Sequence, residues 1–172
     1  GRVEVDGKYV TLDDGTPLQY MPLAVEQNLT ASKYIETAGA RMKKYEVDRT
    51  AYSDGRMPDN DIVLYRYADV LLMKAEAKVR IGESGDEHLH AVRSRVGMPS
   101  LAATLANILD ERLLEVVGEG WRRQDMIRFG TYCAPYDIHT PSAADKKRYT
   151  IVFPIPEKAR ELNPNLAQNP GY

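Results

Sequence analysis

Residues that cross-link a chain or bind metals are scarce in this sequence. It has one cysteine, Cys133, and three histidines among 172 residues. A single cysteine excludes an internal disulfide and a thiolate cluster, and the histidines are not spaced to place two metal ligands on one helix face. We therefore expect no metal site. We also expect no catalytic cysteine, because no histidine partner for it is apparent.

Long apolar runs and an excess of one charge sign are also missing. No run reaches the roughly 18 apolar residues that a membrane-spanning helix requires, and no signal peptide is recognisable. The 23 lysines and arginines nearly balance the 25 aspartates and glutamates, so the formal net charge is only −2 and attraction to nucleic acid is not expected. Phosphate-binding loops and nucleophile elbows are absent too. The sequence predicts no cofactor and no enzymatic activity.

What the chain does contain is the composition of a globular domain, with 43% hydrophobic and 28% charged residues. A chain of this length buries about 70% of the surface that it exposes when unfolded. We predict one domain over residues 1–172 in three regions. Residues 1–58 form a hairpin and loop region, residues 59–130 form helical pairs, and residues 131–172 form a loop, a short strand and a C-terminal tail.

The first region has strong turn signals. The pair Asp6-Gly7 interrupts the alternating pattern of VEVDGKYV, which predicts a β-hairpin. The pair Asp14-Gly15 predicts a second turn, and residues 41–47 are expected to form another short strand. The polar run over 48–61 predicts a loop, and its last three residues, 59–61, can each cap a following helix.

The second region is expected to contain four helices that end at glycines. We predict helices over 62–81, 86–95, from the N-cap Thr104 onward, and over 121–129, because apolar residues recur there at helical spacing. Helix pairs joined by short turns indicate a mainly α-helical, α-solenoid-like fold. In the tail we expect a polar loop over 141–148, a buried strand over 149–155 and a helical turn over 156–164.

The first predicted helix has two apolar faces. At about 100° per residue, Leu71, Leu72 and Ala75 lie on one side, whereas Val70 and Met73 lie near the opposite side. A helix on the surface of a small domain needs only one apolar stripe. We therefore expect neighbours on both sides, supplied by the stack itself or by helices upstream of residue 1.

The most highly charged stretch is ILDERLLEVVGEGWRRQDMIRFG, in which Glu111, Glu115 and Glu119 recur every fourth residue. Two carboxylates on one helix face can be read as a general acid and base of a glycoside hydrolase. The favoured interpretation is structural: ion pairs such as Glu119 with Arg122 or Arg123, and Asp125 with Arg128, orient two helices. The interleaved arginines keep the carboxylates ionised, which removes the general acid.

Aromatic side chains are the candidates for ligand contact, because their faces stack on the C–H-rich surfaces of sugars. We single out four of them, each with the alternative that it is a core or loop-rim residue: Tyr52, Trp121, Tyr132 and Tyr136. If they cluster in a concave pocket, a sugar ligand is favoured, whereas a flat apolar patch favours a protein partner.

Three segments, in this order, resemble one protein family. They are RYADVLLMKAEA (66–77), ERLLEVVGEGWRRQDMIRFG (111–130) and FPIPEKARELNPNLAQNPGY (153–172). Together they resemble the C-terminal region of the SusD/RagB family of nutrient-binding outer-membrane lipoproteins, over residues from about 40 to 172. The last segment is typical of the family's C-terminus, so the chain is expected to be the C-terminal portion of a longer protein.

The resemblance implies tetratricopeptide-like helix pairs and an irregular remainder that carries the ligand site. It implies non-catalytic capture of an oligosaccharide or another nutrient at the cell surface for delivery to a SusC-like TonB-dependent transporter. The location would be the outer membrane, facing outward, through an N-terminal lipid anchor absent from this chain. The family's ligand-binding residues vary, so none is transferred. The alternative is a helical-repeat scaffold for protein–protein interaction with no small-molecule ligand.

Overall fold

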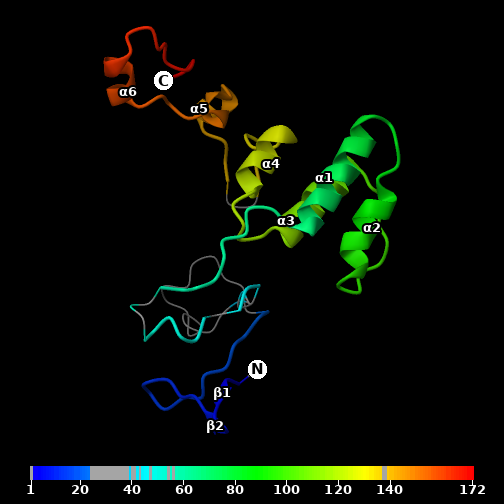
Figure 1. Cartoon of the computed structure of the whole chain (residues 1–172), viewed down its shortest axis with the longest axis vertical. Helices are drawn as coiled ribbons and strands as arrows, with labels where there is room; N and C mark the ends of the chain where they lie inside the picture. The colour runs from blue at the N-terminus through cyan, green and yellow to red at the C-terminus, as the bar shows by residue number, and fades with distance from the viewer. Residues whose placement is uncertain are drawn as a thin grey trace. The chain divides into compact units, whose positions relative to one another are not determined.

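A computed structural model of the chain describes residues 2–23, 39, 42, 44–46, 48–53, 55, 57–136 and 139–172. Contacts divide the chain into two compact units, Gly1–Asp61 and Ile62–Tyr172, and each is described here by itself (Figure 1). Among the described residues, no helix is long and apolar enough to cross a bilayer.

The first unit begins with the predicted hairpin. Strands β1 (Glu4–Val5) and β2 (Lys8–Tyr9) pair antiparallel. The two turn residues between them, Asp6 and Gly7, have φ angles of 51° and 74°. Positive φ at both positions is the backbone of a two-residue hairpin turn, which explains why aspartate and glycine occupy it. The hairpin prediction is confirmed.

A second turn follows where Asp14-Gly15 predicts it. Gly15 has a φ of 82°, and the N–H of Leu12 donates to the carbonyl of Thr16 at 2.8 Å. Of the strand predicted over 41–47, residues 41, 43 and 47 lie outside the described part, and residues 44–46 are not in a strand. The loop prediction over 48–61 agrees with the described residues of that run, which form turns and extended chain.

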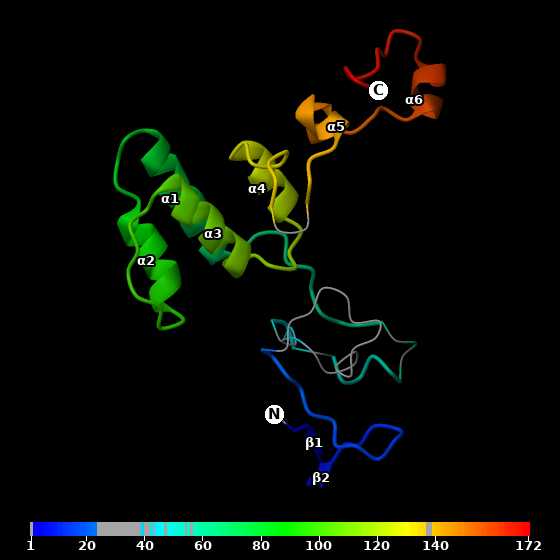
Figure 2. The ribbon, with the colours of Figure 1, turned by 180° about the vertical axis from the view of Figure 1, so that it is seen from behind.

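The second unit is mainly α-helical, as predicted, and its helices follow one another in short steps. They are α1 (Tyr67–Arg80), α2 (Asp86–Ser94), α3 (Leu105–Glu115), α4 (Arg122–Arg128), α5 (Ala143–Lys146) and α6 (Glu157–Leu162), with a 3-10 turn at Tyr149–Ile151. Helices α1, α2 and α3 lie side by side in both ribbon views (Figure 2). With the hairpin of the first unit, this confirms the predicted fold class.

Helix α1 begins five residues later than predicted, at Tyr67. Two of the expected capping residues bind the preceding loop: the N–H of Asp59 donates to Asp48 at 2.9 Å, and the side-chain amide of Asn60 donates to the carbonyl of Glu46 at 3.1 Å. Non-helical chain continues to Arg66, whose backbone is extended. In contrast, α3 begins as predicted, because the Thr104 hydroxyl accepts a hydrogen bond from the N–H of Asn107.

The core of this unit lies between the first three helices. Leu72 and Ala75 of α1, Leu89 and Val92 of α2, and Ile108 of α3 form one buried cluster. Full burial of each larger aliphatic side chain stabilises the fold by roughly 1.5–3 kcal/mol. Leu72 and Ala75 belong to the first apolar face of α1, and the residues of α2 and α3 are the partners that cover this face.

The second apolar face of α1 is not covered by the described residues. Val70, Met73 and Ile81 are 47%, 39% and 71% exposed. The expectation of neighbours on both sides is therefore met on one side only, because α2 and α3 both pack around the face that contains Leu72.

The predicted strand over 149–155 is wrong. Its first residues form the 3-10 turn, and side chains of the C-terminal tail bind the following backbone where a strand partner would have done so. The Gln168 amide accepts from the N–H of Ile155 and donates to its carbonyl, at 2.8 and 3.0 Å. Asn169 donates to the carbonyl of Phe153, and the Tyr172 hydroxyl donates to that of Val152.

Candidate functional site

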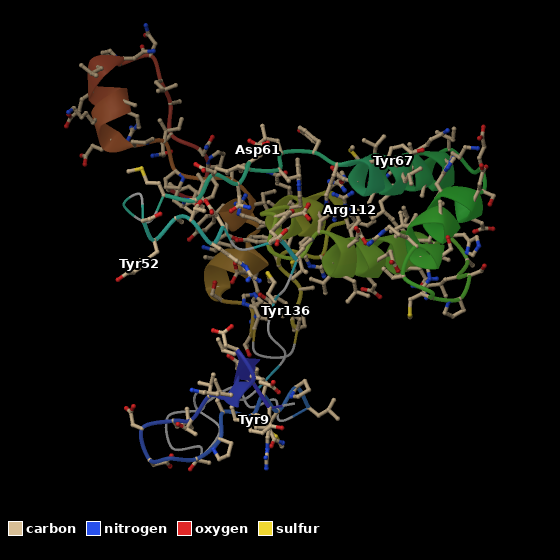
Figure 3. The ribbon with its side chains drawn as sticks, turned by 60° about the horizontal axis from the view of Figure 1, so that its bottom comes forward. Tyr9, Tyr52, Asp61, Tyr67, Arg112 and Tyr136 are labelled. Atoms are coloured by element: carbon tan, nitrogen blue, oxygen red, sulfur yellow. The ribbon has the colours of Figure 1, made fainter. Side chains whose placement is uncertain are left out.

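The charged stretch singled out in the sequence forms a buried ion network centred on Arg112. This side chain is 1% exposed and donates to Asp69 of α1 at 2.6 Å and to Asp125 of α4 at 2.8 Å. One residue of α3, labelled in Figure 3, thus joins two other helices. Since unpaired charges are strongly disfavoured in an apolar interior, this geometry fixes how α1, α3 and α4 meet.

The network continues through Glu76 and Arg128. Arg128 donates to both carboxylate oxygens of Glu76 and to Asp125, and Arg80 also donates to Glu76. Burial alone would raise the pKa of Glu76, but the hydrogen bonds from Arg128 and Arg80 outweigh it and hold that pKa below its ordinary value. The predicted pair of Asp125 with Arg128 is confirmed.

The three regularly spaced glutamates of α3 and the turn after it are all bound by arginines. Glu111 accepts from Arg93, Glu115 from Arg66 and Arg95, and Glu119 from Arg66. Arg122 and Arg123, the partners expected for Glu119, instead donate to backbone carbonyls: Leu109 for the first, Thr150 and Ile151 for the second. Arginines therefore bind all three carboxylates, in agreement with the structural interpretation of this charged stretch.

Of the predicted aromatic candidates, Trp121 lies against a ring that the sequence analysis did not single out. Its ring centroid is 5.1 Å from that of Tyr65, with the two planes at 45°. Tyr65 is 64% exposed and immediately precedes Arg66. In the sequence, the only sign of Tyr65 as a candidate is its position next to Arg66. That position becomes informative only once the partners of Arg66, Glu115 and Glu119, are known.

Tyr132 lies next to Arg123, whose guanidinium carbon is 5.1 Å from the Tyr132 ring centroid and 4.2 Å from that of Phe153. The arginine is therefore held between two aromatic rings, an arrangement with favourable cation–π energy. Phe153 is 70% exposed. It was also missed as a candidate, because it lies in the segment predicted to be a buried strand.

The remaining two candidates are Tyr136, in the second unit, and Tyr52, in the first. The ring of Tyr136 stacks on His139 with a centroid distance of 4.9 Å. Tyr52 lies in the first unit and is 83% exposed. Tyr52 lies two residues after Thr50, in a turn that Asp48 holds: the Asp48 carboxylate accepts from both the N–H and the hydroxyl of Thr50. Within the second unit, Trp121, Tyr132 and Tyr136 each contact a different ring or cation, and Figure 3 labels Tyr52 and Tyr136.

A groove in the second unit runs between α1 and α2, with a volume of about 690 Å³. Ala68 and Leu71 of α1 and Ala91 and Val92 of α2 line it, together with charged side chains such as Lys74. None of the four predicted aromatic residues contributes to it. Among the described residues, no cluster of three or more His, Cys, Asp or Glu side chains could hold a metal ion.

Comparison with known proteins places these features in a family. The model of the SusD family matches residues 22–172. The chain is 30% identical over 139 residues to the starch-binding protein SusD of Bacteroides thetaiotaomicron, covering 77% of this chain and 25% of that protein. It is 29% identical over 130 residues to a SusD-like protein of Formosa agariphila, covering 66% of this chain and 25% of that protein.

Comparison with solved structures points to the same family. The surface glycan-binding protein A of Bacteroides thetaiotaomicron superposes with a TM-score of 0.55 and 32% identity, over 66% of this chain and 25% of that one. Its complex with laminarihexaose gives the same TM-score and identity, over 65% of this chain and 25% of that one. The chain thus spans about a quarter of the length of the proteins it matches. It belongs to the SusD family.

Proposed function

We propose that this chain is part of a cell-surface protein that captures an oligosaccharide without cleaving it and delivers it to a SusC-like TonB-dependent transporter. The proposal places the protein at the outer membrane, facing outward and held by a lipid anchor. The observation that carries it is the family match over residues 22–172, together with the similarity to a glycan-binding protein in complex with laminarihexaose.

The charge arrangement supports binding without hydrolysis. The regularly spaced carboxylates that a hydrolase could use are bound by arginines, which favours a structural role for them over a catalytic one. Affinity at a single site should be modest, because a sugar exchanges hydrogen bonds with water for hydrogen bonds with protein at little net gain. Aromatic stacking supplies the remainder of the binding energy.

The proposal is tested by native electrophoresis of the purified chain in gels that contain starch, laminarin or no polysaccharide. We expect slower migration in at least one of the two polysaccharides, with bovine serum albumin unaffected. We also expect no increase in reducing ends when the same polysaccharide is incubated with the chain. Unchanged mobility in both, from a chain whose far-ultraviolet circular dichroism shows folded helices, would contradict the proposal.

A second candidate function is a helical-repeat scaffold that binds a protein. The exposed apolar face of α1, with Val70, Met73 and Ile81, favours it, since large exposed apolar patches often mark protein contacts. This alternative predicts no retardation by any polysaccharide, so the same gels separate the two functions.

A further inference from the structure

Tyr65 and Trp121 together form what we name the aromatic corner. Their ring centroids lie 5.1 Å apart, and the planes are tilted by 45°. The two residues come from distant parts of the chain, one just before α1 and the other just before α4. Tyr65 is 64% exposed, and Trp121 is half-buried. A large aromatic surface is therefore offered to solvent beside a ring that is partly anchored in the fold.

The ion pairs around Arg66 hold the corner in place. Arg66, which follows Tyr65, donates to the Glu119 carboxylate at 2.7 Å and to both the carboxylate and the backbone carbonyl of Glu115. Glu119 lies two residues before Trp121 and its side chain is 3% exposed. The same cluster thus fixes the backbone that carries each ring.

The backbone on the Trp121 side is fixed by its own geometry as well. Gly118 and Gly120 have φ angles of 78° and 81°, a left-handed conformation that glycine adopts readily. The carbonyl of Trp121 accepts from the N–H of Asp125 at 3.0 Å, so Trp121 joins the first turn of α4. A site whose rings are ordered before binding loses less conformational entropy when a ligand arrives.

We propose that the aromatic corner is a binding site for a pyranose ring of a neutral oligosaccharide, which stacks on one ring and touches the other with its edge. Tilted aromatic faces match the C–H-rich face of a sugar. The ligand is neutral because the arginines that directly follow the two rings are already engaged: Arg66 pairs with Glu115 and Glu119, and Arg122 donates to the backbone carbonyl of Leu109. The inference rests on the proposed glycan-binding function and assigns it to two residues of this chain.

The chain contains a single tryptophan, so its fluorescence reports on the corner directly. Laminarihexaose and maltohexaose are titrated into the purified chain while Trp121 emission is followed. We expect a saturable change in emission with the oligosaccharide whose polymer retards the chain in gels. Tyr65→Ala should weaken binding by about two- to twelvefold, which is the factor in Kd that corresponds to one aromatic contact of about 0.5–1.5 kcal/mol.

Tyr67→Ala is the matched control, because Tyr67 is 75% exposed, lies two residues away and lines the groove between α1 and α2 instead. It should bind like the unchanged chain. If a polysaccharide retards the chain but Trp121 emission stays constant, or if Tyr65→Ala binds as tightly as the unchanged chain, the corner is not the site and the proposed function stands. No retardation by any polysaccharide would overturn both.

Discussion

At the scale of single residues, Arg112 shows how the fold depends on one buried charge. Its guanidinium pairs with two carboxylates from different helices, and one oxygen of Asp69 is buried without a hydrogen-bond partner among the described residues. Stability in this region therefore depends on the arginine more than on either acid. Removing one partner of a buried pair leaves an uncompensated charge, which costs far more than the pair contributes when intact.

We predict that Arg112→Met lowers the free energy of unfolding by about 3–5 kcal/mol, measured by urea denaturation followed by circular dichroism. Arg112→Lys should also destabilise, because an ammonium group does not present the planar fork that joins two carboxylates. The matched control is Arg95→Met. The Arg95 side chain is 59% exposed in its pair with Glu115, so a loss below about 1 kcal/mol is expected. Equal losses at positions 95 and 112 would contradict a special role for Arg112.

At the scale of elements, the turn that carries Tyr52 is held by the carboxylate of Asp48. Hydrogen bonds lower the pKa of Asp48 to about 2. The largest contribution comes from the backbone N–H of Asp59, and the next largest come from the hydroxyl and the N–H of Thr50. A lowered pKa in the folded state stabilises the turn above the ordinary aspartate pKa of about 3.9. That contribution is lost as the pH falls from about 4 through about 2.

This linkage predicts that the carboxyl carbon of Asp48 titrates near pH 2 by nuclear magnetic resonance. The amide of Asp59 should stay protected from hydrogen exchange at pH 4, and Asp48→Asn should reduce that protection because an uncharged amide oxygen is a weaker acceptor. Asp14→Asn is the control: Asp14 binds only the separate Thr16 turn, so Asp59 should be unaffected. An ordinary titration midpoint for Asp48 would contradict the hydrogen bonds described.

The sequence predicts elements well where the signal is local. The Asp6-Gly7 hairpin, the Thr104 cap and the glycines that end α1 and α2 each depend on a few neighbouring residues. Helix α5 was missed although Ser142 and Asp145 form a reciprocal capping box, a local signal that was present. Prediction fails where distant side chains decide, as in the tail, where Gln168 binds the backbone of Ile155.

The features of the candidate site also fall into those with a local sequence signal and those that depend on distant side chains. Trp121 stands out because it is the only tryptophan, and Asp125 with Arg128 is a pair three residues apart on one helix. The ring beside Trp121 and the partner of Glu119 come from Tyr65 and Arg66. Both depend on how the chain entering α1 meets the turn before α4, and no local pattern encodes that meeting.

At the scale of the whole molecule, the second unit has a buried core and an ion network of its own. The buried cluster of α1, α2 and α3 and the ion network from Asp69 to Arg128 lie within Ile62–Tyr172. This unit also exceeds the size of about 70–80 residues below which a single core rarely suffices. The prediction of one domain over 1–172 and the division into two compact units make different statements about how the isolated second unit behaves.

We predict that residues 62–172 fold without residues 1–61. The isolated segment should keep the helical circular dichroism of the full chain, and its thermal midpoint should lie within a few degrees, since a change of 1 kcal/mol shifts the midpoint of a domain this size by about 4–8 °C. As control, Arg112→Met should lower both midpoints equally, because its partners, Asp69 and Asp125, are inside the segment. A segment without helical signal would mean that the first unit is required for folding, and residues 1–172 would then be one cooperative domain.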